Sequence, residues 1–179
     1  MGFYRGPHWF KLPDTLRFEP AETPKLLIQV ESRGYDDSNA NRRQRIVING
    51  SQVLSSNSGR SYRVTRLEQD GNGAYTYNSS NGYDVYGSSS NGDSLNTFLN
   101  TFNDGDLLVL NTHDEPNNNR GRFKTNLVNN FGARLQDSSV WESRCSYILV
   151  AVKGRKTPIY EQLRPRYSTG GSYATLYIY

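Results

Sequence analysis

The sequence is short of the residues that build several common kinds of site. It contains one cysteine, Cys145, and two histidines among 179 residues. A single cysteine cannot form a disulfide within the chain, and a zinc site takes three or four Cys, His, Asp or Glu ligands. We therefore expect no disulfide, no metal site and no cofactor. Cys145 is expected to be a small buried apolar residue.

Long apolar stretches are also missing. The longest apolar run is Tyr147–Val152, which is only six residues long. A membrane-spanning helix needs about 20 such residues. The first residues, MGFYRGPHWFKLPD, contain no apolar core of signal-peptide length. We expect a protein without a membrane span that is made in a cytoplasm and is not exported by a signal peptide.

The sequence also has no strong charge bias and no common catalytic or phosphate-binding motif. The chain has 21 Lys and Arg against 17 Asp and Glu, a net charge of +4. Small basic groups beside tyrosines could bind nucleic acid, but so mild a bias is typical of a mixed solvated surface. There is no Gly-x-Ser-x-Gly motif and no glycine-rich phosphate loop before a helix. We expect neither nucleic-acid binding nor enzymatic activity.

What the sequence has in plenty is tyrosine, with 13 residues, and short runs of strand-forming residues. Strand patterns occupy residues 25–32, 43–50, 61–68, 74–78, 107–112, 147–152 and 172–179. QDGNG, at residues 69–73, is a hairpin-turn signal between two of them. Residues 172–179 alternate strictly, which places Tyr173, Thr175, Tyr177 and Tyr179 on one face of a strand.

Two stretches have the apolar spacing of a helix. Residues 95–102 form one apolar face, with Asp93 or Ser94 as the expected N-cap. Residues 123–131 repeat that spacing, and Gly132 is expected to end the second helix. Strands in the core with two helices packed on them indicate the α+β class.

We divide the chain into three parts. Residues 1–24 contain four prolines and several aromatics, which predicts an arm lying on the surface of its own domain or of a neighbouring chain. Residues 25–164 form the domain. Residues 165–179 form a C-terminal tyrosine-rich strand.

The ordered motifs of the domain resemble the interleukin-like EMT inducer family. They are GRSYRVTRLEQDGNG, YDVYG, LNTFLNTFNDGDLLVLNTHDEP, NLVNNFGAR, WESRCSYILVAVKG and TPIYEQ, in this order along residues 59–162. The resemblance implies two twisted antiparallel β-sheets with two packed α-helices. Cys145 stands where the family has aspartate, Pro116 and Ser61 stand where it has glycine, and Tyr147 replaces a tryptophan.

The resemblance also implies a binding site. In the stem of protein O-mannose N-acetylglucosaminyltransferase, such a domain is a lectin for terminal β-linked N-acetylglucosamine. The family's ligand residues match Arg60, Asp114 and Arg144. An ionised aspartate can accept hydrogen bonds from two hydroxyls, and arginines donate to sugar oxygens. Aromatic residues that could stack on a sugar ring are Tyr62, Tyr83, Tyr86 and Trp141.

A setting without export signal or disulfides fits a virion. We therefore expect a non-catalytic, lectin-like component of a phage tail fibre, baseplate or capsid surface, made in the host cytoplasm and part of an oligomeric assembly. Its partners would be a host glycan, such as one ending in N-acetylglucosamine, and other virion subunits bound through the arm and the C-terminal strand. The alternatives are an assembly module with an idle sugar site, a structural ion-pair cluster at Arg60, Asp114 and Arg144, and an enzyme of cell-wall sugars using Asp114 and Asp84.

Overall fold

The computed structural model describes residues 24–37, 44–53, 59–139, 141–167 and 171–179. The predicted arm, apart from Pro24, lies outside the described residues. The strands are β1 (Leu26–Gly34), β2 (Arg45–Ile48), β3 (Ser51–Gln52), β4 (Ser61–Gln69), β5 (Tyr75–Tyr83), β6 (Leu107–Asp114), β7 (Ser146–Val152), β8 (Tyr160–Arg164) and β9 (Ser172–Ile178). The helices are α1 (Ser89–Asn100) and α2 (Lys124–Phe131), with short 3₁₀ turns η1 (Arg120–Arg122) and η2 (Leu135–Asp137).

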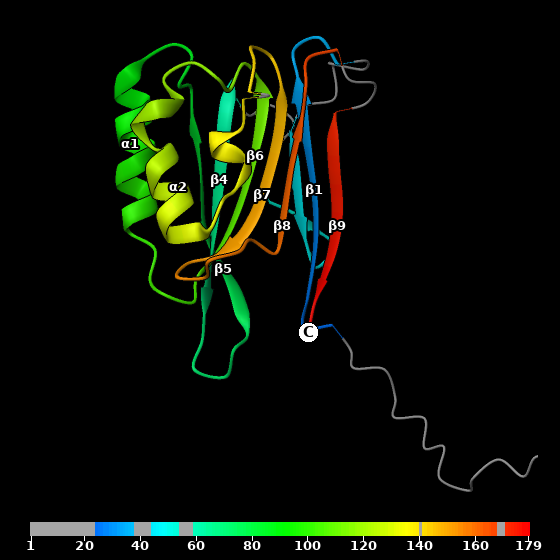
Figure 1. Cartoon of the computed structure of the whole chain (residues 1–179). Coiled ribbons are helices and arrows are strands. Elements are labelled where there is room, and N and C mark those ends of the chain that lie inside the picture. The colour runs from blue at the N-terminus through cyan, green and yellow to red at the C-terminus, as the bar shows by residue number, and fades with distance from the viewer. Residues whose placement is uncertain (1–23, 38–43, 54–58, 140, 168–170) are drawn as a thin grey trace, which may run out of the picture.

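The elements form three layers (Figure 1), with the helices on one side, β4 to β8 in the middle and β1 with β9 on the other side. One apolar core lies between the helices and the middle layer, and includes Leu95, Leu127 and Leu149. A second core lies between the two strand layers, and includes Ile28 and Val109. Alternation along β1, where Leu26, Ile28 and Val30 are buried, places one face of that strand on the second core.

The α+β class is confirmed, but the expectation of two separate antiparallel sheets is wrong. In the described part of the chain, nine strands join in one mixed sheet. The link is a short parallel pairing of β1 with β6, at Arg33 with His113 and Gly34 with Asp114. Ser32 draws the strands together there, because its Oγ donates to the Thr112 carbonyl (2.7 Å) and accepts from the Tyr147 backbone N–H (3.1 Å).

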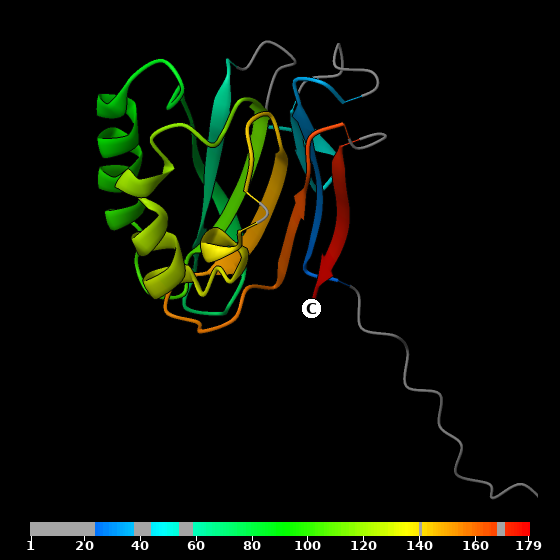
Figure 2. The same ribbon diagram turned by 45° about the horizontal axis from the view of Figure 1, so that its top comes forward.

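Two expectations about element boundaries need correction. Helix α1 begins at Ser89, with the side chain of Ser88 capping it, and not at Asp93 or Ser94. Strand β5 continues to Tyr83, through residues that read as turn-rich. In contrast, α2 ends as expected at Gly132, which has φ +67°. The strand pattern at residues 172–179 is confirmed as β9 (Ser172–Ile178), which pairs antiparallel with β1 (Figure 2).

Strand direction determines where the loops meet. β1 and β6 run parallel to each other, and β4 runs antiparallel to β6. The ends of β1 and β6 therefore lie beside the beginnings of β4 and β7. The same pole receives the end of β5, since Tyr83 pairs with Tyr62. Five chain segments thus converge at one end of the strand layers.

Candidate functional site

A pocket of about 250 Å³ lies at this pole of the molecule. The residues that line it are Tyr35, Arg60, Tyr86, Asp114, Glu115, Ser143 and Arg144. The structure therefore brings together all three residues expected from the sequence, Arg60, Asp114 and Arg144, although 84 positions separate the first from the last. Among the described residues, no group of three or more His, Cys, Asp or Glu could hold a metal ion.

The first side of the pocket is the Arg60 wall, which consists of Arg60, Asp84 and Tyr86. The Arg60 Nε and Nη2 donate to the two carboxylate oxygens of Asp84 at 2.9 and 2.7 Å. The guanidinium lies 4.3 Å from the centre of the Tyr86 ring. The hydrogen bonds between Arg60 and Asp84 lower the pKa of Asp84 and raise the pKa of Arg60. Arg60 is therefore held as a cation against an aromatic face.

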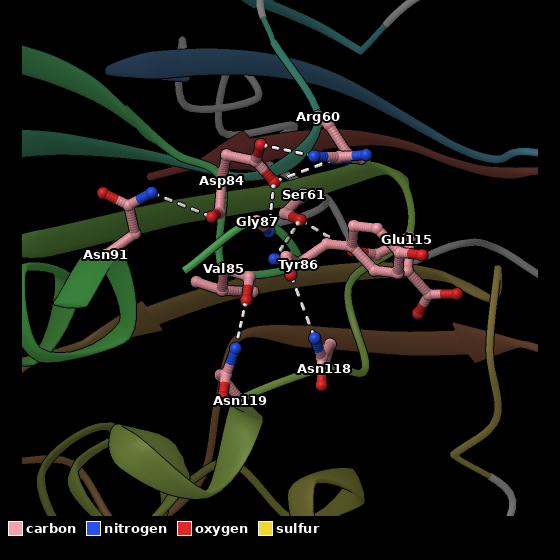
Figure 3. Close-up of polar contacts among 10 residues, drawn as sticks. All are labelled: Arg60, Ser61, Asp84, Val85, Tyr86, Gly87, Asn91, Glu115, Asn118 and Asn119. Atoms are coloured by element: carbon pink, nitrogen blue, oxygen red, sulfur yellow. Dashed lines mark hydrogen bonds and ion pairs between the residues drawn. The ribbon is translucent and has the colours of Figure 1, made fainter. Parts of the chain in front are cut away.

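The turn that carries Tyr86 is fixed by asparagines (Figure 3). The side-chain amides of Asn91, Asn119 and Asn118 donate to three successive backbone carbonyls, those of Asp84, Val85 and Tyr86, at 2.9, 2.7 and 2.9 Å. Asn118 and Asn119 lie in the loop after β6 and Asn91 lies in α1, and together they form an asparagine clamp on the turn of the Arg60 wall.

The second side is the Arg144 wall, which consists of Arg144, Asp36 and Tyr35. The Arg144 Nη1 lies 3.2 and 3.4 Å from the Asp36 carboxylate oxygens, and its guanidinium is 4.5 Å from the Tyr35 ring centre. Asp36 also accepts from the Arg166 Nε at 2.6 Å. Burial alone would raise the pKa of Asp36, but the two arginines outweigh it and lower that pKa.

Asp114 lies between the walls without a direct partner. Among the described residues, its carboxylate takes part in no hydrogen bond and no ion pair, because each arginine is bound to another aspartate. The structural ion-pair cluster considered from the sequence is therefore not formed in this part of the chain. Partial burial raises the pKa of Asp114, against the opposing charges of His113, Arg60 and Arg144. Asp114 is a half-buried carboxylate with unused acceptor capacity.

Glu115 links the chain segments around the pocket through hydrogen bonds. Its side chain is buried and accepts from the Ser143 hydroxyl, from the Arg144 backbone N–H (2.9 Å) and from the Asn117 backbone N–H (3.0 Å). Its carbonyl accepts from the Ser61 hydroxyl at 2.6 Å. The Ser61 Oγ in turn accepts from the Tyr86 backbone N–H at 3.2 Å. Glu115 thereby fixes the backbone that carries Arg144.

Backbone conformation at the site is unusual for residues other than glycine. Ser61, Asp114 and Arg144 have φ of +76°, +63° and +64°. This left-handed conformation costs such residues about 1 kcal/mol or more. Strained residues cluster where geometry is required for function, and two of these three are the expected ligand residues.

The four aromatic candidates have different environments. Tyr62 is fully buried, and Trp141 is buried beneath the Arg120 guanidinium. Tyr83 packs against the helix-side core. Of the four, Tyr86 lines the pocket, and Tyr35, which sequence reasoning missed, lines the opposite side. Each of these two tyrosines is about half exposed.

The expectation for Cys145 is met by the structure. Cys145 is fully buried in the helix-side core, and burial raises the pKa of its thiol to about 12. In the described residues, no helix is both long enough and apolar enough to cross a membrane.

Comparison with known proteins agrees with the motifs. A family model for the interleukin-like EMT inducer matches residues 64–155, just over half of the chain. Asp114 and Arg144 lie inside the matched segment, and Arg60 lies shortly before it. A search of curated proteins gave no match. With these motifs in order, an α+β fold and a family model covering this much of the sequence, the chain belongs to the interleukin-like EMT inducer family.

Proposed function

We propose that this protein is a non-catalytic carbohydrate-binding module whose sugar site is the pocket between the Arg60 wall and the Arg144 wall. The observation that carries the proposal is Asp114, a half-buried carboxylate left unpaired between two arginines that are each bound to another aspartate. A carboxylate in this state suits two sugar hydroxyls, which are its natural donors.

The walls supply the other features that a sugar needs. Arg60 uses Nε and Nη2 on Asp84, and Arg144 uses Nη1 on Asp36, so each guanidinium keeps N–H donors for ligand oxygens. A sugar ring with an acetamide offers hydroxyl and carbonyl oxygens to such donors. Tyr86 and Tyr35, each about half exposed, add aromatic rings at the two sides of the pocket.

The carboxylates of the pocket also support a non-catalytic role. A glycosidase needs two carboxyl groups placed across the scissile bond. Asp84 is tied to Arg60 and has a lowered pKa, which is the wrong direction for a general acid. The Glu115 carboxylate is occupied by Ser143 and the backbone N–H groups of Arg144 and Asn117. Asp114 is left without a second free acid in the pocket lining.

The setting of this function stays a prediction from the sequence. A virion component made in a host cytoplasm, with a host glycan as one partner and other virion subunits as further partners, remains our proposal. The second candidate, an assembly module with an idle sugar site, is favoured by one observation, the row of exposed tyrosines on β9.

A glycan array probed with the multimerised full chain tests the proposal. We expect binding to a defined set of glycans, reduced about tenfold or more by Asp114→Asn and by Arg60→Ala, since each removes a charged hydrogen-bonding partner. Arg122→Ala is the matched control, because Arg122 is exposed outside the pocket and pairs only loosely with Asp93 at 3.7 Å.

Other outcomes would separate the alternatives. If the multimerised chain binds no glycan, the carbohydrate-binding proposal fails and the assembly module is favoured. Release of sugar from a polysaccharide, abolished by Asp114→Asn, would establish an enzyme instead.

A further inference from the structure

Strand β9 has a free edge in the described part of the chain. It pairs with β1 along one side, over seven consecutive residues from Ser172 to Ile178 without a break in register. No described strand pairs with its other side. Figures 1 and 2 both show β9 at the outer side of its layer. Its outer edge therefore presents backbone donors and acceptors for another strand.

The other edge strands of the described sheet carry protection that β9 lacks. β3 has two residues, and β8 has five, including Glu161 and Arg164. β5 has an internal glycine, Gly82, and a break in register opposite Arg66 and Leu67. Short length, charge and bulges are the usual defences of an edge. β9, with the sequence SYATLYI, has no charge, proline, internal glycine or bulge.

The exposed face of β9 adds an aromatic surface. Tyr173 and Tyr177 are each 56% exposed, and Tyr179, which directly follows the strand, is 63% exposed, while Ala174 on the other face is buried. The Tyr173 hydroxyl and the Thr175 Oγ1 lie 2.9 Å apart in a hydrogen bond. So much exposed tyrosine on one regular strand is typical of an interface.

We propose that β9 pairs antiparallel with β9 of a second copy of this chain, about a two-fold axis at Thr175. This register is self-complementary, because it places Tyr173 opposite Tyr177 of the other copy twice, on the same face of the sheet. Ala174 then lies opposite Leu176 on the inner face. Aromatic cross-strand pairs stabilise antiparallel sheets, and an uncharged strand brings no like charges together across the axis.

The area available is that of a weak but specific dimer. An aromatic side chain buries about 150–250 Å². Six tyrosines, each a little over half exposed, carry on the order of 500–800 Å² of accessible surface, and pairing covers the part that faces the partner strand. Together with the two strand edges, the covered area lies at the lower end of the range for specific interfaces, near roughly 1,000 Å². We therefore expect a dissociation constant in the micromolar range. The inference does not depend on the proposed sugar site.

Sedimentation of the full chain over a roughly hundred-fold concentration range around micromolar tests the proposal. We expect a monomer–dimer equilibrium that Thr175→Lys weakens about tenfold or more, because it places two like charges on the axis. Thr175→Val should preserve the dimer. Thr76→Lys is the matched control, since Thr76 is an exposed threonine on the other long edge strand, β5.

A cross-linking experiment tests the register itself. Opposed residues of an antiparallel pair have Cα atoms about 4.5–5.5 Å apart, within the range that a disulfide bridges. Thr175→Cys should therefore form a covalent dimer under mild oxidation, whereas Thr76→Cys should not. The native Cys145 is buried and gives a low background. A chain that stays monomeric at every concentration, or a Thr175→Cys variant that does not cross-link, would overturn the proposal.

Discussion

The two walls of the pocket use the same three kinds of residue but are held in different ways. In each, an arginine is bound by an aspartate and lies over a tyrosine ring, at 4.3 Å for Arg60 and 4.5 Å for Arg144. Arg60 binds Asp84 with two nitrogens at 2.9 Å or less. Arg144 binds Asp36 with one nitrogen at 3.2–3.4 Å, and shares that carboxylate with Arg166.

The contacts that hold the two walls in position also differ. Side chains hold the Arg60 wall, through the bidentate pair and the asparagine clamp on its turn. Backbone contacts hold the Arg144 wall, since Glu115 accepts from the Arg144 N–H and Gly34 lies against the Arg144 carbonyl. The Arg60 guanidinium is therefore preorganised for a ligand, whereas the Arg144 guanidinium can adjust on a fixed backbone. Changes to each wall should have different consequences.

The largest effect is expected from breaking the backbone support of the Arg144 wall. A Cβ at Gly34 would lie 1.9 Å from the Arg144 carbonyl oxygen, which is backbone and cannot move aside easily. Gly34→Ala should lower the free energy of unfolding by about 3 kcal/mol, measured by chemical denaturation. Gly121→Ala is the control, because a Cβ there meets nothing within 4 Å. Equal stability of the two variants would contradict the close approach.

The next effect tests the link between the walls at Ser61. Ser61→Ala removes hydrogen bonds to the Glu115 carbonyl and from the Tyr86 N–H, and should cost about 2 kcal/mol in unfolding free energy. Ser61→Gly loses the same bonds but relieves the strain at φ +76°, so it should cost about 1 kcal/mol less. If Ser61→Gly unfolds at a lower temperature than Ser61→Ala in thermal denaturation, the backbone at Ser61 is not strained.

A smaller loss of stability is expected from changing the aspartates that bind the two arginines, Asp84 and Asp36. Because the Asp84–Arg60 pair is more than a third exposed, Asp84→Asn should cost under about 1 kcal/mol of stability. Asp84 has a lowered pKa in the fold, so its contribution is present above the pKa of the unfolded chain and is lost as the pH falls through the lowered value. Glycan affinity should fall more for Asp84→Asn than for Asp36→Asn, as measured by titration. The reverse order would show that the Arg144 wall is the more rigid one.

The smallest effect on stability is expected for a change at Asp114, and it is a gain in stability instead of a loss. Its pKa is raised, so the ionised carboxylate costs stability above that pKa. Asp114→Asn should therefore stabilise the fold at neutral pH, by about 0.5 kcal/mol after solvent screening. The gain should vanish below the pKa of an unfolded aspartate. Glycan binding by the native chain should weaken on acidification at a higher pH than that at which either Asp–Arg pair is lost.

Parts of this structure follow from local sequence, and those parts were predictable. QDGNG gave the hairpin between β4 and β5, where Asp70 accepts from the Asn72 and Ala74 backbone N–H groups. Gly132 ends α2 because the chain adopts a left-handed conformation there. Arg60, Asp114 and Arg144 were expected from the resemblance to the family and not from local sequence, and the pocket contains all three.

Other parts depend on contacts between distant residues. Asp36 holds Arg144 from 108 positions away, so nothing near either residue indicates the pair. The single mixed sheet depends on a two-residue pairing of β1 with β6. Helix α1 includes Gly92, although glycine disfavours a helix. A Cβ at Gly92 would lie 3.0 Å from the Arg122 Cβ, so the close packing of α1 on η1 requires glycine there. In each case a tertiary contact determines what the local sequence leaves open.

The position of the pocket at one pole has a consequence for how many surfaces the protein could touch. The pocket lies where β1 ends, beside the beginning of β9. A two-fold axis through Thr175 reverses the direction of the second β9 and carries the second pocket to the opposite pole. Such a dimer could not place both pockets on one flat surface. It would act as a bridge that joins two separate glycan-bearing bodies, and agglutination rather than tighter adhesion would be its outward effect.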